Sequence, residues 1–135
     1  MKFLVTLLVA VSVAGCSSRE TSQLIGEWTP ASINDCSADG TTITVNSSGL
    51  TYRSGKSELQ LIKISAFRDH GSETEIDGQF RIYRPTDNVF WHPETTMRFE
   101  IEADRAQLLG EVSEDGALIP SDRRIVEELT LRRCP

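Results

Sequence analysis

The sequence predicts an all-β fold: a single small antiparallel β-barrel or sandwich of about eight strands. Short runs of alternating or β-branched residues recur along the chain, and clusters of Gly, Asn, Asp and Ser separate them. No long segment repeats its apolar residues at the spacing of a helix. With 135 residues, the chain is long enough for one domain with a modest core.

The first element is a leader rather than a strand. Lys2 precedes an apolar run that is too short to span a bilayer, and the run ends at Val13-Ala14-Gly15-Cys16. This segment resembles a bacterial lipoprotein signal with its lipobox, although Val13 stands where that family most often has leucine. We therefore expect a signal peptide over residues 1–15, a lipidated tether over 16–23 and the β-domain over 24–135.

The resemblance implies a location in the cell envelope. It implies cleavage after Gly15, a diacylglyceryl thioether on Cys16 and acylation, such as palmitoylation, of the new amino terminus. Two or more acyl chains would hold the protein to a membrane. Ser17 and Ser18 follow the cysteine, a pattern similar to lipoproteins of the outer membrane that face the periplasm. The inner membrane stays open as an alternative.

The charge balance narrows the range of partners. Without Lys2, 13 of the 14 Lys and Arg residues remain against 20 Asp and Glu residues, so the net charge is −7. The charges are interspersed, which argues against nucleic acid and against binding of anionic lipid through a basic patch. A small ligand or a basic protein partner remains compatible with this surface.

The cysteines predict one disulfide. Once Cys16 is assigned to lipid, only Cys36 and Cys134 remain, and an exported domain folds in an oxidising compartment. There is no CxxC motif, and neither histidine stands at ligand spacing to a cysteine, so we expect no metal site.

The strands follow in order from Leu24. Residues 24–28 open the folded part, and strands over 42–45 and 50–53 flank a turn at 46–49. Residues 59–67 form the next strand, where apolar residues on both faces indicate either burial on two sides or a bulge.

The middle of the chain contains the strongest turn signals. We expect a turn over 68–72, then a hairpin whose strands, 73–76 and 79–84, flank Asp77-Gly78. Loops over 85–88 and 92–94 surround Val89-Phe90-Trp91.

The residue pattern indicates the next strands clearly, except at the end of the chain. Residues 96–103 alternate, with Met97, Phe99, Ile101 and Ala103 on the inner face. Strands over 106–112 and 117–119 flank a turn at 114–116. Asp122 could cap a short helix, but the alternation of 129–132 favours a strand at the end.

Two short motifs resemble known families. Gly26-Glu27-Trp28 resembles the Gly-x-Trp of lipocalins and related calycins, which implies that Trp28 closes one end of a barrel. The later lipocalin signatures are missing. Ser48-Gly49-Leu50-Thr51-Tyr52 resembles an element of periplasmic C-type lysozyme inhibitors, which are small disulfide-bonded β-barrels, but the tryptophan and Lys-Gly pair that follow in that family are absent.

No residue pattern indicates catalysis. The chain has no Gly-x-Ser-x-Gly, Gly-rich phosphate loop or His-Glu-x-x-His motif, so we expect no enzyme activity, catalytic residue or cofactor. We expect a membrane-anchored lipoprotein whose β-domain binds a protein or envelope component, in the manner of an inhibitor. Phe90, Trp91 and His92, in an irregular segment between prolines, are the candidate binding residues. The alternative is a lipocalin-like carrier of a small apolar ligand. Whether the barrel is hollow or packed would distinguish the two; the identity of the ligand and the oligomeric state stay open.

Overall fold

The structure is a computed structural model that describes residues 22–82, 90–122, 126–127 and 129–135. The expected signal peptide, Cys16 and most of the expected tether lie outside the described residues. So do residues 83–89, which include the end of the strand expected over 79–84 and the whole loop expected over 85–88.

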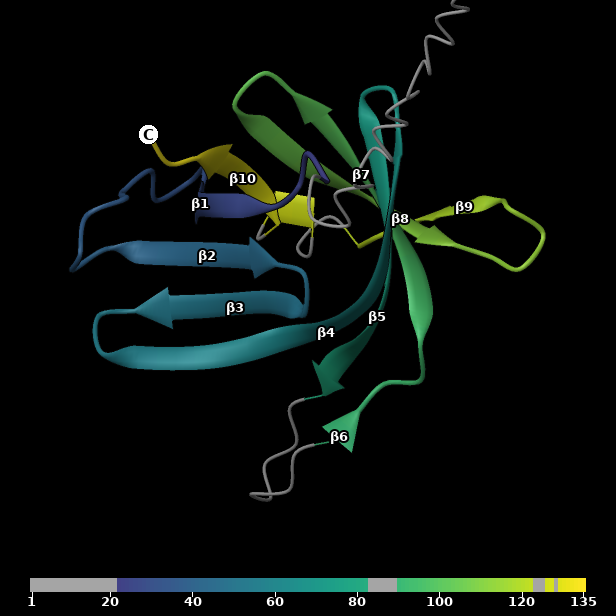
Figure 1. Ribbon diagram of the computed structural model, residues 1–135, viewed down its shortest axis with the longest axis horizontal. Coiled ribbons are helices and arrows are strands. Elements are labelled where there is room, and N and C mark those ends of the chain that lie inside the picture. Colours follow the sequence, from purple (N-terminus) through teal and green to yellow (C-terminus); the bar gives the residue numbers. More distant parts are fainter. Residues whose placement is uncertain (1–21, 83–89, 123–125, 128) are drawn as a thin grey trace, which may run out of the picture.

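The described chain forms β-strands joined mostly by short turns (Figure 1). The strands are β1 (Gly26–Pro30), β2 (Thr41–Asn46), β3 (Gly49–Ser54), β4 (Ser57–His70), β5 (Glu73–Ile82), β6 (Phe90–Trp91), β7 (Thr95–Glu102), β8 (Arg105–Val112), β9 (Leu118–Pro120) and β10 (Thr130–Arg133). Neighbours in the sheet pair antiparallel throughout.

The sheet closes into a barrel because β10 pairs with two strands. It pairs with β1 on one side and with β8 on the other, so β1, β2, β3, β4, β5, β7, β8 and β10 form a closed eight-stranded ring. Closure removes the exposed edges that an open sheet would leave. The expected small all-β barrel is confirmed. The two shortest strands lie off the ring: β6 pairs with β5, and β9 pairs with β8.

Large apolar side chains fill the centre of the barrel. The alternation expected for residues 96–103 places Met97, Phe99 and Ile101 in the core, opposite residues from the other strands. Fully buried apolar residues come from both sides of the ring: Leu24, Trp28, Val45, Leu50, Ile62, Ile76, Phe99 and Leu131. The interior is therefore packed rather than empty over most of its length.

The first hairpin and the irregularity of the next strand are confirmed. β2 and β3 pair in register from Thr41 to Asn46, around the expected turn. Between β3 and β4 the register shifts between Leu50 and Thr51, so Leu61 has no residue opposite it. The apolar residues on both faces of β4 therefore mark a β-bulge.

Two turn predictions in the middle of the chain were wrong. Arg68 and Asp69 lie within β4, and the chain turns only at Gly71-Ser72. Asp77-Gly78 lies inside the continuous strand β5 rather than in a hairpin turn. A second bulge in β4, at Ser65, lies opposite this pair. A Cβ atom at position 78 would lie 2.6 Å from the backbone oxygen of Lys63, so glycine permits a close approach of two strands here.

The structure of the C-terminal third differs from the prediction at Ala103 and combines the two alternatives for the end of the chain. Ala103 lies not on the inner face of a strand but in the β7–β8 turn, with a φ of 52°. Both alternatives for the end of the chain hold in part. The Val126 amide donates to the Asp122 carbonyl in a helical turn, and the strand β10 follows it.

Candidate functional site

The candidate binding residues Phe90 and Trp91 lie on a short strand outside the ring. β6 pairs with the end of β5, where Trp91 lies opposite Arg81. The Nζ of Lys63 lies 4.2 Å from the centre of the Trp91 ring, and the guanidinium carbon of Arg81 lies 5.3 Å from it. Both distances lie within the range of cation–π attraction. We call Lys63, Arg81, Phe90 and Trp91 the β6 surface.

The β6 surface is separate from the core. Phe90 is 40% exposed, and Trp91 is half-buried but is not part of the core cluster. Arg81 is held in place because its Nε donates to the Gln60 carbonyl at 2.9 Å. Neither Lys63 nor Arg81 forms an ion pair with a described residue. The arrangement presents an aromatic side chain beside two cations, which suits recognition of a partner more than stabilisation of the core.

Trp28, in contrast to Trp91, belongs to the core. It is fully buried, its Nε1 donates to the Leu24 carbonyl at 2.9 Å, and the guanidinium of Arg133 lies 4.2 Å from its ring centre. Trp28 is therefore a core residue of β1.

The histidines do not form a site in the described chain. His92 is exposed, and its Nδ1 lies 2.9 Å from the Pro93 carbonyl oxygen. His70 ends β4 and is also exposed. Within the described residues, no group of three or more His, Cys, Asp or Glu side chains is arranged to hold a metal ion.

An apolar pocket of about 370 Å³ lies at one end of the barrel, where β1 ends and β2 begins. Ile43, Tyr52 and Leu61 line it from the barrel wall. Ser32 and Ile33, from the loop that follows β1, and Leu129 complete it. Volumes of this size hold small ligands in other proteins. No local sequence pattern indicates this pocket, because its lining comes from five separate segments.

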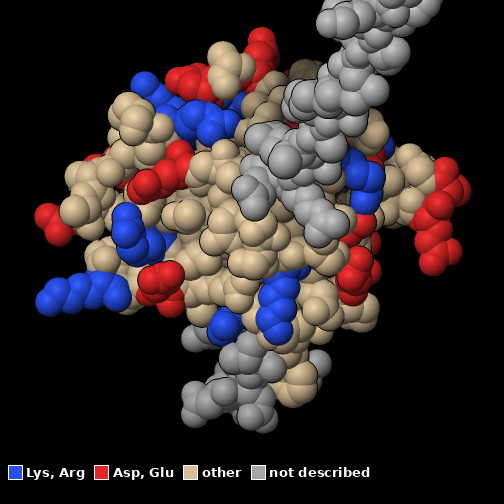
Figure 2. All heavy atoms as spheres, viewed as in Figure 1, with Lys and Arg blue, Asp and Glu red and all other residues tan. Residues whose placement is uncertain are grey.

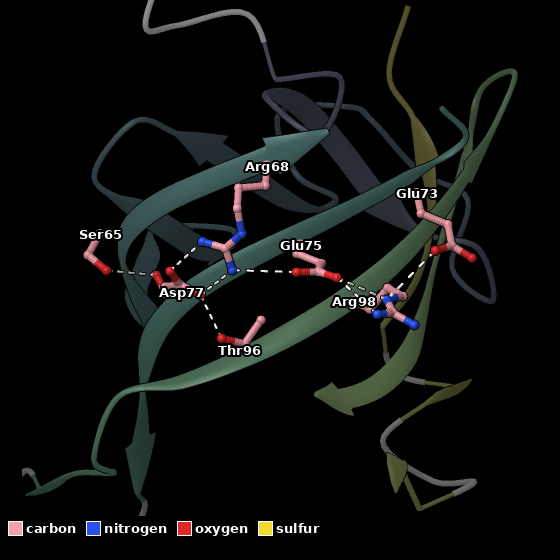
Figure 3. Close-up of polar contacts among 7 residues, drawn as sticks. All are labelled: Ser65, Arg68, Glu73, Glu75, Asp77, Thr96 and Arg98. Atoms are coloured by element: carbon pink, nitrogen blue, oxygen red, sulfur yellow. Dashed lines mark hydrogen bonds and ion pairs between the residues drawn. The ribbon is translucent and has the colours of Figure 1, made fainter. Parts of the chain in front are cut away.

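A ladder of charged side chains crosses the outer face of β4, β5 and β7 (Figure 3). Arg68 donates to both carboxylate oxygens of Asp77, at 2.5 and 2.6 Å, and Thr96 donates to Asp77 at 2.6 Å. Glu75 accepts from Arg98 at 2.9 Å, and its other oxygen lies 3.5 Å from Arg68. Glu73 extends the ladder to Arg98 at 3.7 Å.

Two carboxyl groups of the ladder, those of Asp77 and Glu75, have lowered pKa values. The hydrogen bond from Arg68 holds the pKa of Asp77 below its ordinary value of 3.8. The hydrogen bond from Arg98 holds the pKa of Glu75 below 4.5. The hydrogen bond with Asp77 is in turn the main cause of a raised pKa of Arg68. Because opposite charges bind each other here, the ladder is a stabilising network and offers no free acid or base for catalysis. Sequence reasoning missed it, although the alternation of Glu73, Glu75 and Asp77 is the signal of a strand.

The expected disulfide is confirmed: Cys36 and Cys134 are bonded, with 5.7 Å between their Cα atoms. It joins the loop after β1 to the end of β10, where the Cys134 amide also donates to the Glu27 carbonyl at 2.8 Å. Asp35, next to Cys36, contacts buried Thr29 of β1. The disulfide therefore fastens the segment that carries Ser32 and Ile33 to the barrel.

Comparison with known proteins adds no assignment, since no family model, curated protein or solved structure matches this chain. Among the described residues, no helix is long and apolar enough to cross a membrane.

Proposed function

We propose that this protein is a lipid-anchored lipoprotein of the cell envelope whose β-barrel is a non-enzymatic binding module. The leader and Cys16 support the anchor, and the Cys36–Cys134 disulfide fits an oxidising compartment such as the periplasm. In this proposal the protein belongs to the outer membrane and faces the periplasm. Its partner is a protein or another envelope component, bound in the manner of an inhibitor.

The position of Trp91 carries the proposal. A large aromatic side chain that lies outside the core, beside exposed Phe90 and two cations, offers contact area at a low cost in conformational entropy. The packed interior favours the same reading over a carrier, because a barrel filled with Leu, Ile and Phe leaves binding to its outer surface. The β6 surface is therefore the proposed binding site, and His92 follows it directly.

The binding site is tested by comparing two tryptophan variants. Trp91→Ala should unfold at nearly the wild-type urea concentration and should lose capture of the partner from an envelope extract. Trp28→Ala, the matched control, should lose about 3–5 kcal/mol of unfolding free energy because it empties the core. A large loss of stability in Trp91→Ala would assign this residue to the core and remove the proposed site.

The anchor is tested by replacing the lipid-bearing sulfur. Wild-type protein should partition into the detergent phase, whereas Cys16→Ser should stay unprocessed or appear in the aqueous phase, because a hydroxyl cannot form the thioether. Wild-type protein in the aqueous phase with an unmodified Cys16 would refute the anchor.

The apolar pocket supports a second candidate, a carrier of a small apolar ligand. Ile33 is 49% exposed at this pocket, so Ile33→Trp should fill the pocket without disturbing the core. If the protein is a carrier, a fluorescent apolar probe such as N-phenyl-1-naphthylamine should bind to wild type and to Trp91→Ala but not to Ile33→Trp. Equal binding to all three proteins would exclude this pocket as a carrier site.

A further inference from the structure

The turn after β8 and the strand β9, residues 113–120, lie outside the ring as an arm. One edge of β8 pairs with β7 of the ring as far as Val112, while its other edge pairs with β10 at Arg105 to Gln107 and with β9 at Gly110 to Val112. Figure 1 shows this arm extending away from the barrel at the right of the view. The Ser113 amide donates to the Ala117 carbonyl at 2.9 Å and closes the turn, so the arm has a defined shape.

The arm exposes an apolar strand. Leu118 is 38% exposed and Ile119 is 53% exposed, and all three residues of β9 are exposed. Two adjacent large apolar residues on a projecting strand do not contribute to the core. They provide the kind of surface that a protein partner covers.

A hollow of about 660 Å³ lies beside this strand. Ile119 contributes apolar surface from the arm, and Val112 contributes it from the end of β8. Thr96 and the Arg68–Asp77 pair of the ladder line the hollow from the barrel. Three further carboxylates, Glu94, Glu111 and Glu114, also line the hollow.

These three carboxylates are not neutralised by the described part of the protein. Ser65 donates to Glu94 at 3.2 Å and Thr95 donates to Glu111 at 2.5 Å, but none of the three forms an ion pair with a described Lys or Arg. Residues 106–122 contain four acidic residues and neither Lys nor Arg. Figure 2 shows the acidic side chains gathered on the arm at the right of the view.

We propose that the arm is a docking surface for a basic protein segment, which covers Leu118 and Ile119 and places a Lys or Arg side chain in the hollow. The exposed apolar strand supplies contact area, and the unneutralised carboxylates supply charge of the sign that such a side chain needs. The net charge of the chain beyond the leader, −7, also attracts a basic partner over a longer range. This surface is distinct from the β6 surface and depends neither on the lipid anchor nor on Trp91.

The test uses the full-length protein in detergent micelles and two fluorescein-labelled peptides of twelve residues. One peptide alternates Lys and Val, and the other alternates Lys and Ser. Fluorescence anisotropy should show that the Lys-Val peptide binds several-fold more tightly, because only this peptide can cover the apolar strand. Ile119→Ser should remove that difference.

The charge requirement is tested by two matched triple variants. Glu94→Gln, Glu111→Gln and Glu114→Gln together should weaken binding of the Lys-Val peptide about tenfold, since exposed charge pairs contribute modestly and three are lost. The control triple changes exposed carboxylates elsewhere on the barrel, Glu58→Gln, Glu100→Gln and Glu102→Gln, and should alter binding less than twofold. Far-UV circular dichroism checks that both triples fold. Equal weakening by the two triples, or equal affinity of wild type for the two peptides, would overturn the proposal.

Discussion

Thr42 is a buried polar residue whose hydroxyl is not used. Its side chain is fully buried on β2, and its Oγ1 has no hydrogen-bond partner among the described residues. Thr29 and Thr74, which are equally buried, both use their hydroxyls: Thr29 donates to the Thr41 carbonyl at 2.8 Å, and Thr74 donates to Asp69 at 2.6 Å. The buried hydroxyl groups of Thr29 and Thr74 are therefore hydrogen-bonded, whereas that of Thr42 has no partner among the described residues.

This difference predicts that the same change, Thr to Val, has opposite effects on the free energy of unfolding at positions 42 and 74. Thr42→Val should raise the free energy of unfolding by about 1 kcal/mol, because it removes a buried hydroxyl without a partner and keeps the shape of the side chain. Thr74→Val should lower the same quantity, since it leaves the Asp69 carboxylate without one of its donors. Urea denaturation of both variants measures the two changes. A destabilised Thr42→Val would mean that its hydroxyl has a partner.

Strand β5 shows how an element can differ from its local signals. Asp77-Gly78 is a common hairpin turn, but here the Asp77 carboxylate binds Arg68 of β4 and Thr96 of β7. Partners on both neighbouring strands hold the residue in the middle of the sheet. The bulge of β4 at Ser65 then adjusts the register so that Gly78 pairs with Ile64 and lies close to the Lys63 carbonyl.

The ladder on these strands predicts a pH dependence. Because Asp77 and Glu75 have lowered pKa values in the folded protein, the stability they contribute is present above their ordinary values of 3.8 and 4.5. It is lost as the pH falls through the folded-state pKa values. Asp77→Asn should therefore have a lower free energy of unfolding than wild type at pH 7. We expect a difference of only about 1 kcal/mol, because Arg68 is partly exposed and solvent screens its charge. This difference should shrink towards pH 2.

Chemical denaturation at several pH values measures this difference. Glu58→Gln is the control, since Glu58 is exposed on β4 and forms no ion pair with a described residue. It should follow the wild-type profile. A constant gap between Asp77→Asn and wild type across the pH range would show that the ladder is not the source of the dependence.

At the scale of the whole molecule, the two ends of the described part of the chain are both fastened to the barrel. β10 lies between β1 and β8, and the disulfide bonds residues that are 98 positions apart. At the other end of the described chain, Ser22 and Gln23 bind Asp69 beside the β4–β5 turn. Arg133 also donates to the Gln23 carbonyl at 2.6 Å. The ring is therefore closed by both backbone pairing and a covalent bond.

Removal of the disulfide should have a large effect on stability. A closed loop of about 100 residues contributes about 4.7 kcal/mol in the chain-entropy model, so Cys36→Ser should lower the unfolding midpoint strongly. The intact mass of the folded wild type should lie about two hydrogens below the reduced value. Alkylation of denatured, unreduced wild type at Cys36 and Cys134 would contradict the bond.

The sequence by itself determined the features that depend on neighbouring residues or on counting. Alternation identified most strands and the inner residues of β7, and the two cysteines left after Cys16 allowed only one pair. The leader was read from sixteen consecutive residues and stays a prediction. These signals are local, so they do not need the fold in order to be read.

Only the tertiary structure decided which distant residues meet. Closure of the ring and the bulges in β4 set the register, and the register places Asp77-Gly78 in a strand instead of a turn. The same register brings Lys63 and Arg81 to Trp91, and leaves the arm that contains β9 outside the ring. A shift of one residue would turn every side chain of a strand to the opposite face, and the turn signals near one strand cannot specify its pairing with the next. The candidate sites therefore emerged from packing across the whole sheet.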